Sequence, residues 1–299
     1  MVETAAARAY EHVTESGVRL VGDAFGPRSG APVILLGGAG QTRQSWGDTA
    51  GRLGDVGYHA ITIDQRGHGD SSWVDDTDYE MTHFVDDLVD VAQSFSQPPA
   101  VVGASLGGLA ALIGTGARRL RPAALVLVDI APRIELGGAR RVLDFMAAHP
   151  DGFETLDEAV DAIAAYLPER ERQPTKQGLD RVLRRHGERW RWHWDPNVLN
   201  GIGLILHGDE QTVSRRAREM NRRLLDAARN VDVPAMLVRG RLSDVVTTEG
   251  AREFLEAVPG AEFVDVSGAG HMVAGDRNSA FTDAVVDFLS RHHHPSDST

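Results

Sequence analysis

The chain of 299 residues contains no cysteine. Disulfide bonds, thiolate metal sites and cysteine nucleophiles are therefore excluded. This absence is typical of proteins in a reducing compartment, so we expect a cytoplasmic location. The three histidines at His292, His293 and His294 are adjacent in a polar tail, a poor arrangement for a metal site, and we expect no bound metal.

Long apolar runs are also absent. No stretch approaches the roughly 18 apolar residues of a membrane span, so no transmembrane helix is expected. The first residues carry Glu3 and Arg8 and lack an apolar core, which argues against a signal peptide. Acidic residues outnumber basic ones by 43 to 31, and the net charge of −12 argues against nucleic acid as a partner because phosphate repels it.

The remaining composition is that of an ordinary globular protein, with 42% hydrophobic and 25% charged residues. Short apolar strands alternate with helical segments, which predicts an α/β fold with a mainly parallel sheet covered by helices on both faces. An antiparallel hairpin over residues 11–25 is expected at the edge of this sheet. The other expected strands cover residues 33–36, 59–63, 100–104, 124–128, 235–238 and 262–266, and the helices 45–53, 81–96, 106–117, 248–258 and 278–289.

The alternation stops between about Arg133 and Asn230, where the chain reads as helices with no convincing strand. Insertions into a rigid scaffold occur in its loops. We therefore predict an α/β core formed by residues 1–132 and 231–299, with residues 133–230 inserted as a helical cap, or lid.

One segment joins an apolar strand directly to a helix through Gly103-Ala104-Ser105-Leu106-Gly107. Gly-x-Ser-x-Gly in this context predicts a nucleophile elbow, a strained turn that exposes the serine hydroxyl. Gly103 and Gly107 remove side chains that would clash in such a turn. An ordinary glycine-rich turn is the alternative in a chain with 32 glycines, so the surrounding motifs must decide.

Candidate partners for Ser105 follow other predicted strands, and ligands meet parallel sheets at the carboxyl ends of their strands. A serine hydroxyl needs a base, which histidine supplies near neutral pH, and a carboxylate orients that histidine. His271, in a glycine-rich loop, suits the base. We favour Asp244 as the acid, although it could instead cap the next helix. Asp129, which also ends a strand, is the alternative acid.

The glycine-rich loop Gly37–Gly40 follows the first strand of the parallel sheet. We predict that it forms an oxyanion hole, in which the amides of Ala39 and Leu106 donate to the tetrahedral intermediate. A dinucleotide-binding loop is the rival interpretation, but the third glycine of that motif is absent because position 43 is arginine. We expect no cofactor.

Two further polar or aromatic segments have alternative roles. We expect Arg66, His68 and Asp70 to tie loops together by hydrogen bonds rather than to act on the substrate. Trp192 and Trp194 are candidate substrate-binding residues that would form an aromatic wall over Ser105, and packing of the cap on the core explains them equally well. The arginines between residues 181 and 191 are typical of a solvated face, with an acidic substrate as the alternative.

Together these motifs resemble the α/β-hydrolase superfamily, in its helical-cap branch of esterases, haloperoxidases and epoxide-hydrolase-like enzymes. The matching segments are Leu35–Gly40, Asp64–Ser71, Gly103–Gly108, Gly240–Asp244 and Gly270-His271. That branch usually has His-Gly where this chain has Gly37-Gly38, so the support of the loop must differ. Epoxide hydrolases and haloalkane dehalogenases of this fold carry aspartate at the elbow, and Ser105 instead favours acyl transfer.

The motifs and the resemblance predict a carboxylesterase-like serine hydrolase that cleaves a small carboxylic ester or lactone through an acyl-enzyme. Ser105 attacks, His271 acts as base and then acid, Asp244 orients His271, and Ala39 with Leu106 stabilises the oxyanion. Carbon–carbon bond hydrolysis, perhydrolysis, and thioester or amide cleavage use the same triad and stay open. A non-catalytic receptor for a small ligand is the alternative from another class. The sequence leaves the oligomeric state undetermined, a homodimer included.

Overall fold

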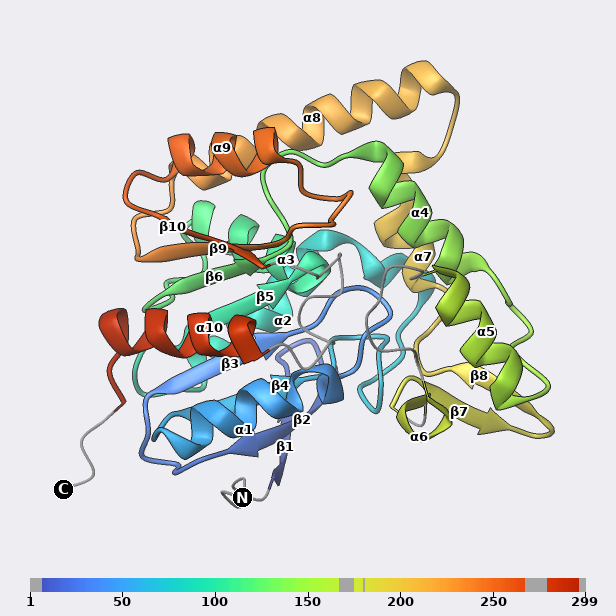
Figure 1. The fold of residues 1–299 in the computed structure, drawn as a ribbon, viewed down its shortest axis with the longest axis horizontal. Coiled ribbons are helices and arrows are strands. Elements are labelled where there is room, and N and C mark those ends of the chain that lie inside the picture. The colour runs from blue at the N-terminus through green and yellow to red at the C-terminus, as the bar shows by residue number, and fades with distance from the viewer. Residues whose placement is uncertain (1–6, 167–174, 180, 267–278, 296–299) are drawn as a thin grey trace.

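A computed structural model describes residues 7–166, 175–179, 181–266 and 279–295 (Figure 1). Its centre is an eight-stranded sheet in the order β1-β2-β4-β3-β5-β6-β9-β10. Only the β1–β2 and β2–β4 pairs are antiparallel, which confirms the predicted edge hairpin and the mainly parallel sheet. The strands are β1 (Arg8–Val13), β2 (Arg19–Phe25), β3 (Pro32–Leu36), β4 (His59–Ile63), β5 (Ala100–Ala104), β6 (Leu125–Val128), β9 (Ala235–Gly240) and β10 (Glu262–Val266).

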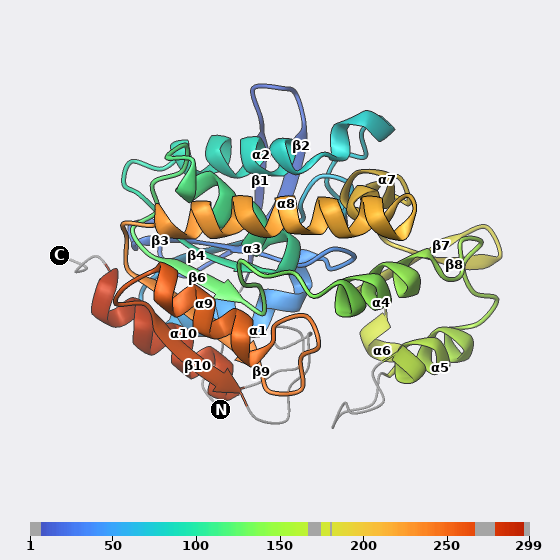
Figure 2. The same cartoon turned by 90° about the horizontal axis from the view of Figure 1, so that it is seen from above.

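The central strands β3, β5, β6 and β9 are buried along their whole length. Helices cover both faces of the sheet, as apolar parallel strands require (Figure 2). On one face lie α1 (Gly47–Asp55) and α10 (Ser279–His292). The opposite face is covered by α2 (Met81–Gln93), α3 (Ser105–Gly116), α8 (Glu210–Arg229) and α9 (Thr248–Ala257). None of the helices in these described ranges is long and apolar enough to span a bilayer.

A separate group of elements follows β6 and gathers at one end of the molecule (Figure 1). It comprises α4 (Leu136–Ala147), α5 (Leu156–Tyr166), α6 (Lys176–Leu179), β7 (Leu183–His186), β8 (Arg189–Trp192) and α7 (Val198–Ile202). The expectation that residues 133–230 hold no strand is wrong, because β7 and β8 pair as an antiparallel hairpin. The hairpin turns at Gly187, whose φ of 60° favours glycine. Arginine and tryptophan alternate along β8 with the period of two that defines a strand.

Helix α8 lies within the range predicted for the cap, but much of it packs on the core. Leu224 and Ala228 belong to the same buried cluster as the central strands. At the end of α3, a Cβ atom added to Gly116 would lie 2.4 Å from the Cα atom of Ala227. The split of the chain at residues 133 and 230 therefore stays a prediction, and the packing favours a cap that ends before α8.

The contact between α3 and α8 gives a stability prediction with a matched control. Gly116→Ala forces the helices apart because the new methyl group meets the backbone of Ala227, and we expect it to lower the free energy of unfolding by about 1–3 kcal/mol. Gly137, in α4, has no atom within 4 Å of an added Cβ. Gly137→Ala should therefore raise the free energy of unfolding by about 0.5–1 kcal/mol. Urea denaturation measures both, and equal effects of the two substitutions would contradict the close contact.

Candidate active site

Ser105 stands at the junction of β5 and α3. Its φ of 44° lies in the left-handed region, which is strained for a residue with a side chain. The flanking glycines make the turn possible, since a Cβ atom on Gly103 would lie 2.7 Å from the carbonyl carbon of Gly107. A Cβ atom on Gly107 would lie 2.5 Å from the Cβ of Leu36. The strained strand-to-helix turn predicted from the motif is present.

The glycine-rich loop after β3 passes directly beside Ser105. A Cβ atom added to Gly38 would lie 3.1 Å from the Cβ of Ser105. The amide of Gly107 donates a 3.1 Å hydrogen bond to the carbonyl of Gly37, which joins this loop to the start of α3. The structure therefore brings two of the predicted site segments, the elbow and the Gly37–Gly40 loop, into contact.

Three side chains bond the backbone of this loop. Gln41 Oε1 accepts from the Gly38 amide at 2.8 Å, and His68 Nε2 accepts from the Gly40 amide at 3.0 Å. Gln65 Nε2 donates to the Gly37 carbonyl at 2.9 Å. None of the described residues accepts a hydrogen bond from the amide of Ala39, which lies between the two bonded amides. This amide is the one predicted as an oxyanion donor.

The side chain of Gln41 explains the departure from His-Gly. A Cβ atom added to Gly37 would lie 3.0 Å from Gln41 Cβ and 3.3 Å from its Oε1. Gln41 thus fills the space that a side chain at position 37 would need. No role was predicted for Gln41 from the sequence. The only hint of such a role was the glycine at position 37, where the branch that the sequence resembles usually has histidine.

His68 is fully buried between two backbone groups. Its Nδ1 lies 2.9 Å from the carbonyl of Arg66, so the proton is assigned to Nδ1 and leaves Nε2 as the acceptor for Gly40. Burial lowers the pKa of His68 to about 4 and keeps the ring neutral near pH 7. The expectation that His68 ties loops together is confirmed.

Other residues of the Asp64–Ser71 segment also tie loops. The buried carboxylate of Asp64 accepts from the amide of Asp70 at 3.0 Å and pairs with the guanidinium of Arg43. Arg43 also pairs with Asp70 at 2.8 Å. Arg66 makes two 2.7 Å hydrogen bonds to the carboxylate of Asp87. The loop-tying role expected for Arg66 and Asp70 is therefore confirmed.

The cap meets these loops through its tryptophan segment. Trp194 is only 4% exposed and forms an isolated β-bridge with His68. A Cβ atom on Gly40 would lie 3.5 Å from Trp194 Nε1 and 3.4 Å from Met146 Cε of α4. Trp192, by contrast, packs on a residue of the cap itself, with its ring centroid 5.3 Å from that of Phe153. Packing of the cap on the core thus accounts for the burial of Trp194. The same packing places Trp194 beside the glycine-rich loop.

The two candidate acids have different surroundings. Asp129 is 1% exposed and follows β6 as Ser105 follows β5, with Ala104 and Val128 in register. Asp244 lies in the loop after β9, where its half-exposed carboxylate accepts a 2.7 Å hydrogen bond from Arg141 of α4. The predicted base, His271, lies outside the described residues.

Asp129 is also held firmly in place. Ser243 Oγ donates to its Oδ2 at 2.6 Å, and the amide of Gly240 donates to its Oδ1 at 3.2 Å. Its φ of 49° makes it, with Ser105, one of four non-glycine residues with positive φ in the described ranges. Strained residues at neighbouring strand ends are typical of functional sites.

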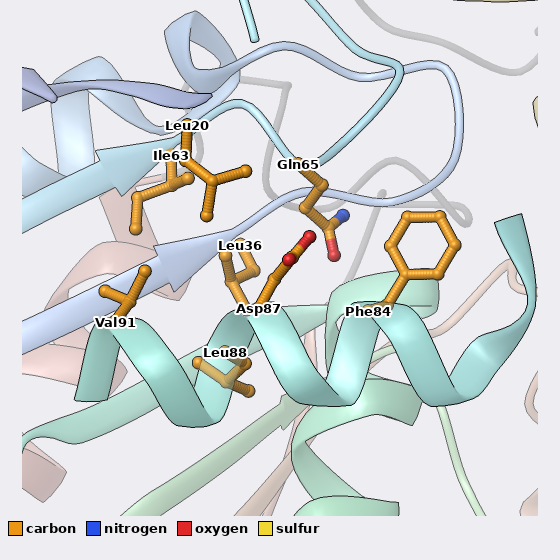
Figure 3. Close-up of a pocket in the computed structure, with 8 residues that line it drawn as sticks. All are labelled: Leu20, Leu36, Ile63, Gln65, Phe84, Asp87, Leu88 and Val91. Atoms are coloured by element: carbon orange, nitrogen blue, oxygen red, sulfur yellow. The ribbon is translucent and has the colours of Figure 1, made fainter. Parts of the chain in front are cut away.

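A small cavity lies between α2 and the sheet, apart from the elbow (Figure 3). It is lined by Leu20, Leu36, Ile63, Gln65, Phe84, Asp87, Leu88 and Val91. Its volume of about 10 Å³ is no more than one water molecule needs, so it is not a ligand site. Among the described residues, no group of three or more acidic or histidine side chains could hold a metal ion.

A family model described as the alpha/beta hydrolase family matches residues 33–284. The chain belongs to the alpha/beta hydrolase family. Two curated relatives are a non-heme chloroperoxidase of Kitasatospora aureofaciens, 27% identical over 93% of this chain and 98% of that protein, and an esterase of Mycobacterium tuberculosis, 28% identical over 85% and 80%. A third, 2-(acetamidomethylene)succinate hydrolase of Mesorhizobium japonicum, is 27% identical over 80% of both chains.

Solved structures of alpha/beta hydrolases share the fold. An alpha/beta hydrolase of Novosphingobium aromaticivorans superposes with a TM-score of 0.77 at 24% identity, covering 97% of this chain and 100% of the other. The E-2-(acetamidomethylene)succinate hydrolase gives a TM-score of 0.78 at 20% identity, covering 95% and 100%. At these identities the likeness establishes the alpha/beta hydrolase fold, whereas the family model and the curated relatives support a hydrolase.

The buried His68 makes stability depend on pH. In the unfolded chain this residue takes up a proton near its ordinary pKa of 6.5, whereas in the folded chain it does so at about 4. The unfolded state therefore binds more protons in this window, so the free energy of unfolding falls as the pH drops from 6.5 towards 4. Urea denaturation at stepped pH should show a slope up to about 1.4 kcal/mol per pH unit steeper for the wild type than for His68→Gln. Parallel curves would show that His68 titrates normally.

Proposed function

We propose that this alpha/beta hydrolase is a serine hydrolase that cleaves a small carboxylic ester or lactone through an acyl-enzyme. The observation that carries the proposal is the strained Ser105 beside a loop whose amide at Ala39 is unbonded among the described residues. A serine hydroxyl on a sharp turn next to an uncommitted amide suits nucleophilic attack on a carbonyl group. The esterase relative supports the same reaction class.

In this mechanism Ser105 attacks the substrate carbonyl, and the charge that develops on its oxygen is received by the amides of Ala39 and Leu106. Leu106 lies in the first turn of α3, where backbone N–H groups lack partners within the helix. The helix dipole adds to their effect on negative charge. His271 takes the proton from Ser105 and returns it to the leaving group, as its position in the sequence motif suggests.

The contacts of the two aspartates support Asp129, rather than Asp244, as the acid behind His271. Charge interactions are stronger where water is excluded, and Asp129 is buried whereas Asp244 is half exposed. Asp244 also has Arg141 as its ion-pair partner. A carboxylate oxygen can accept more than one hydrogen bond, so the bonds from Gly240 and Ser243 leave Asp129 able to orient an imidazole.

The cap would set the size of the substrate. Met146 and Trp194 pack against Gly40, and Trp192 with Phe145 continues the apolar surface into the cap. Apolar walls with few polar groups favour a small uncharged acyl or alcohol group. Perhydrolysis, carbon–carbon bond hydrolysis and binding without turnover use the same elements, so they belong in the substrate panel.

Labelling by a fluorophosphonate tests the nucleophile. We expect the wild-type chain to gain one phosphonyl group on Ser105 by intact mass and peptide mapping, and Ser105→Ala to gain none. Ester hydrolysis should fall by at least about a thousandfold in Ser105→Ala, because the attacking oxygen is lost. Esters and lactones of increasing chain length, a diketone, and acetate with peroxide form the panel. Labelling elsewhere, or unchanged hydrolysis by Ser105→Ala, would refute the proposal.

A pair of isosteric substitutions separates the two acids. We expect Asp129→Asn to lower kcat by about 10³–10⁴, because an amide no longer holds the imidazole in the productive tautomer. Asp244→Asn removes only an exposed pair with Arg141 and should change kcat by less than about tenfold. Thermal unfolding of each variant shows whether the fold is kept. The opposite ranking of the two variants would return the role to Asp244.

A further inference from the structure

We infer that Gln41 and His68 are positioning residues that together aim the Ala39 amide at the oxyanion of the Ser105 adduct. The inference rests on the proposed function. We call the hydrogen bonds from the Gly38 and Gly40 amides to Gln41 and His68 the frame, because they lie on either side of the predicted donor, Ala39. The hydrogen bonds that carry the inference join each side chain to a backbone amide of the loop. Each acts through the backbone of the Gly37–Gln41 loop.

The hydrogen bonds of the loop amides carry the inference. The Gly38 amide donates to Gln41 Oε1, the Gly40 amide to His68 Nε2, and the Gln41 amide to the Gly38 carbonyl. Ala39 thus lies between two amides whose directions are set by side-chain acceptors. The N–H of Ala39 shares its peptide plane with the Gly38 carbonyl, which accepts from the Gln41 amide, and the following plane carries the Gly40 amide bound by His68. The preceding plane carries the Gly38 amide bound by the Gln41 side chain, so all three planes have little freedom and the Ala39 N–H points one way.

The two acceptors are themselves fixed from opposite sides. Gln41 packs against Gly37, where the absent side chain leaves room for it. His68 is anchored by its Nδ1 bond to the Arg66 carbonyl. Stabilisation of a developing oxyanion requires donors that are already in place and need no reorganisation. The loop meets this requirement with no side chain at position 37.

His68 also contacts the cap. Its backbone bridges Trp194, and the neighbouring Gly69 amide donates to the His193 carbonyl at 2.8 Å. Trp194 in turn lies against Gly40, the residue whose amide His68 binds. The frame therefore joins the tryptophan segment of the cap to the glycine-rich loop through one buried residue, whose backbone bridges Trp194 and whose ring binds Gly40.

Substitutions that keep or remove the acceptor atom test this role. His68→Leu and Gln41→Met preserve bulk but leave the Gly40 or Gly38 amide without its acceptor. His68→Gln restores an acceptor near the position of Nε2. His293→Leu is the matched control, because His293 is also buried with one bond to a backbone carbonyl, at the amino end of β3. The measurements are the rate constant for fluorophosphonate labelling, kcat and KM on one ester, and the thermal midpoint of each variant.

We expect His68→Leu and Gln41→Met each to slow labelling and kcat by about tenfold to a hundredfold, with KM within about threefold of the wild type. His68→Gln should recover most of the rate, and His293→Leu should lose stability but no rate. If His68→Leu fails to fold, Gln41→Met and His68→Gln carry the same test.

A wild-type rate constant in either acceptor-free variant would overturn the inference, as would a His68→Gln variant as slow as His68→Leu. Failure of the underlying proposal gives a different result. In that case the wild-type chain itself is not labelled at Ser105.

Discussion

The start of α3 approaches the end of β3 so closely that no side chain fits between them. Gly107 lies against Leu36, with no room for a Cβ atom, and its amide bonds the carbonyl of Gly37. This contact fixes the height of Ser105 above the sheet and its distance from the glycine-rich loop. Because β3 and β5 are adjacent and buried throughout, the end of β3 and the start of α3 cannot move apart. The position of Ser105 is therefore a property of the whole sheet and not of a flexible turn.

A second consequence of the parallel sheet is the pairing of two strained residues. Ser105 and Asp129 leave neighbouring strands from residues that are in register, and both have positive φ. Strain of this kind costs about 1–3 kcal/mol at each residue and persists only where the surroundings impose it. Here β6 lies between β5 and β9, and the amide of Gly240 and the hydroxyl of Ser243 hold the Asp129 carboxylate. The carboxyl ends of two adjacent strands thus lead directly into Ser105 and the buried Asp129.

The sequence allowed the parallel strands and the elbow to be predicted, because buried apolar runs and Gly-x-Ser-x-Gly are local signals. The β7–β8 hairpin was missed because β7 does not alternate and the alternation in β8 covers only four residues, too short a signal to define a strand by itself. From the sequence, Asp244 was favoured over Asp129 as the acid, but both follow strands. The burial of Asp129 and the contact of Asp244 with Arg141, which separate the two, are visible only in the structure. The support of the oxyanion loop was also out of reach. His68 acts on Gly40 across 28 positions, and no local pattern encodes such a contact.

The residue whose ring supports the loop also bridges the cap through its backbone, and this has a consequence for how the enzyme could diverge. His68 bonds Gly40 on one side and bridges Trp194 on the other. A change in the cap that displaces Trp194 would therefore also displace His68, and with it the loop that carries the Ala39 amide. In the proposed mechanism the cap would set the substrate size and the loop would stabilise the transition state, so the two properties would be physically coupled through His68. Variation that alters substrate size while preserving rate is expected at positions such as Phe145, whose ring contacts are with the cap residues Tyr166 and Trp192.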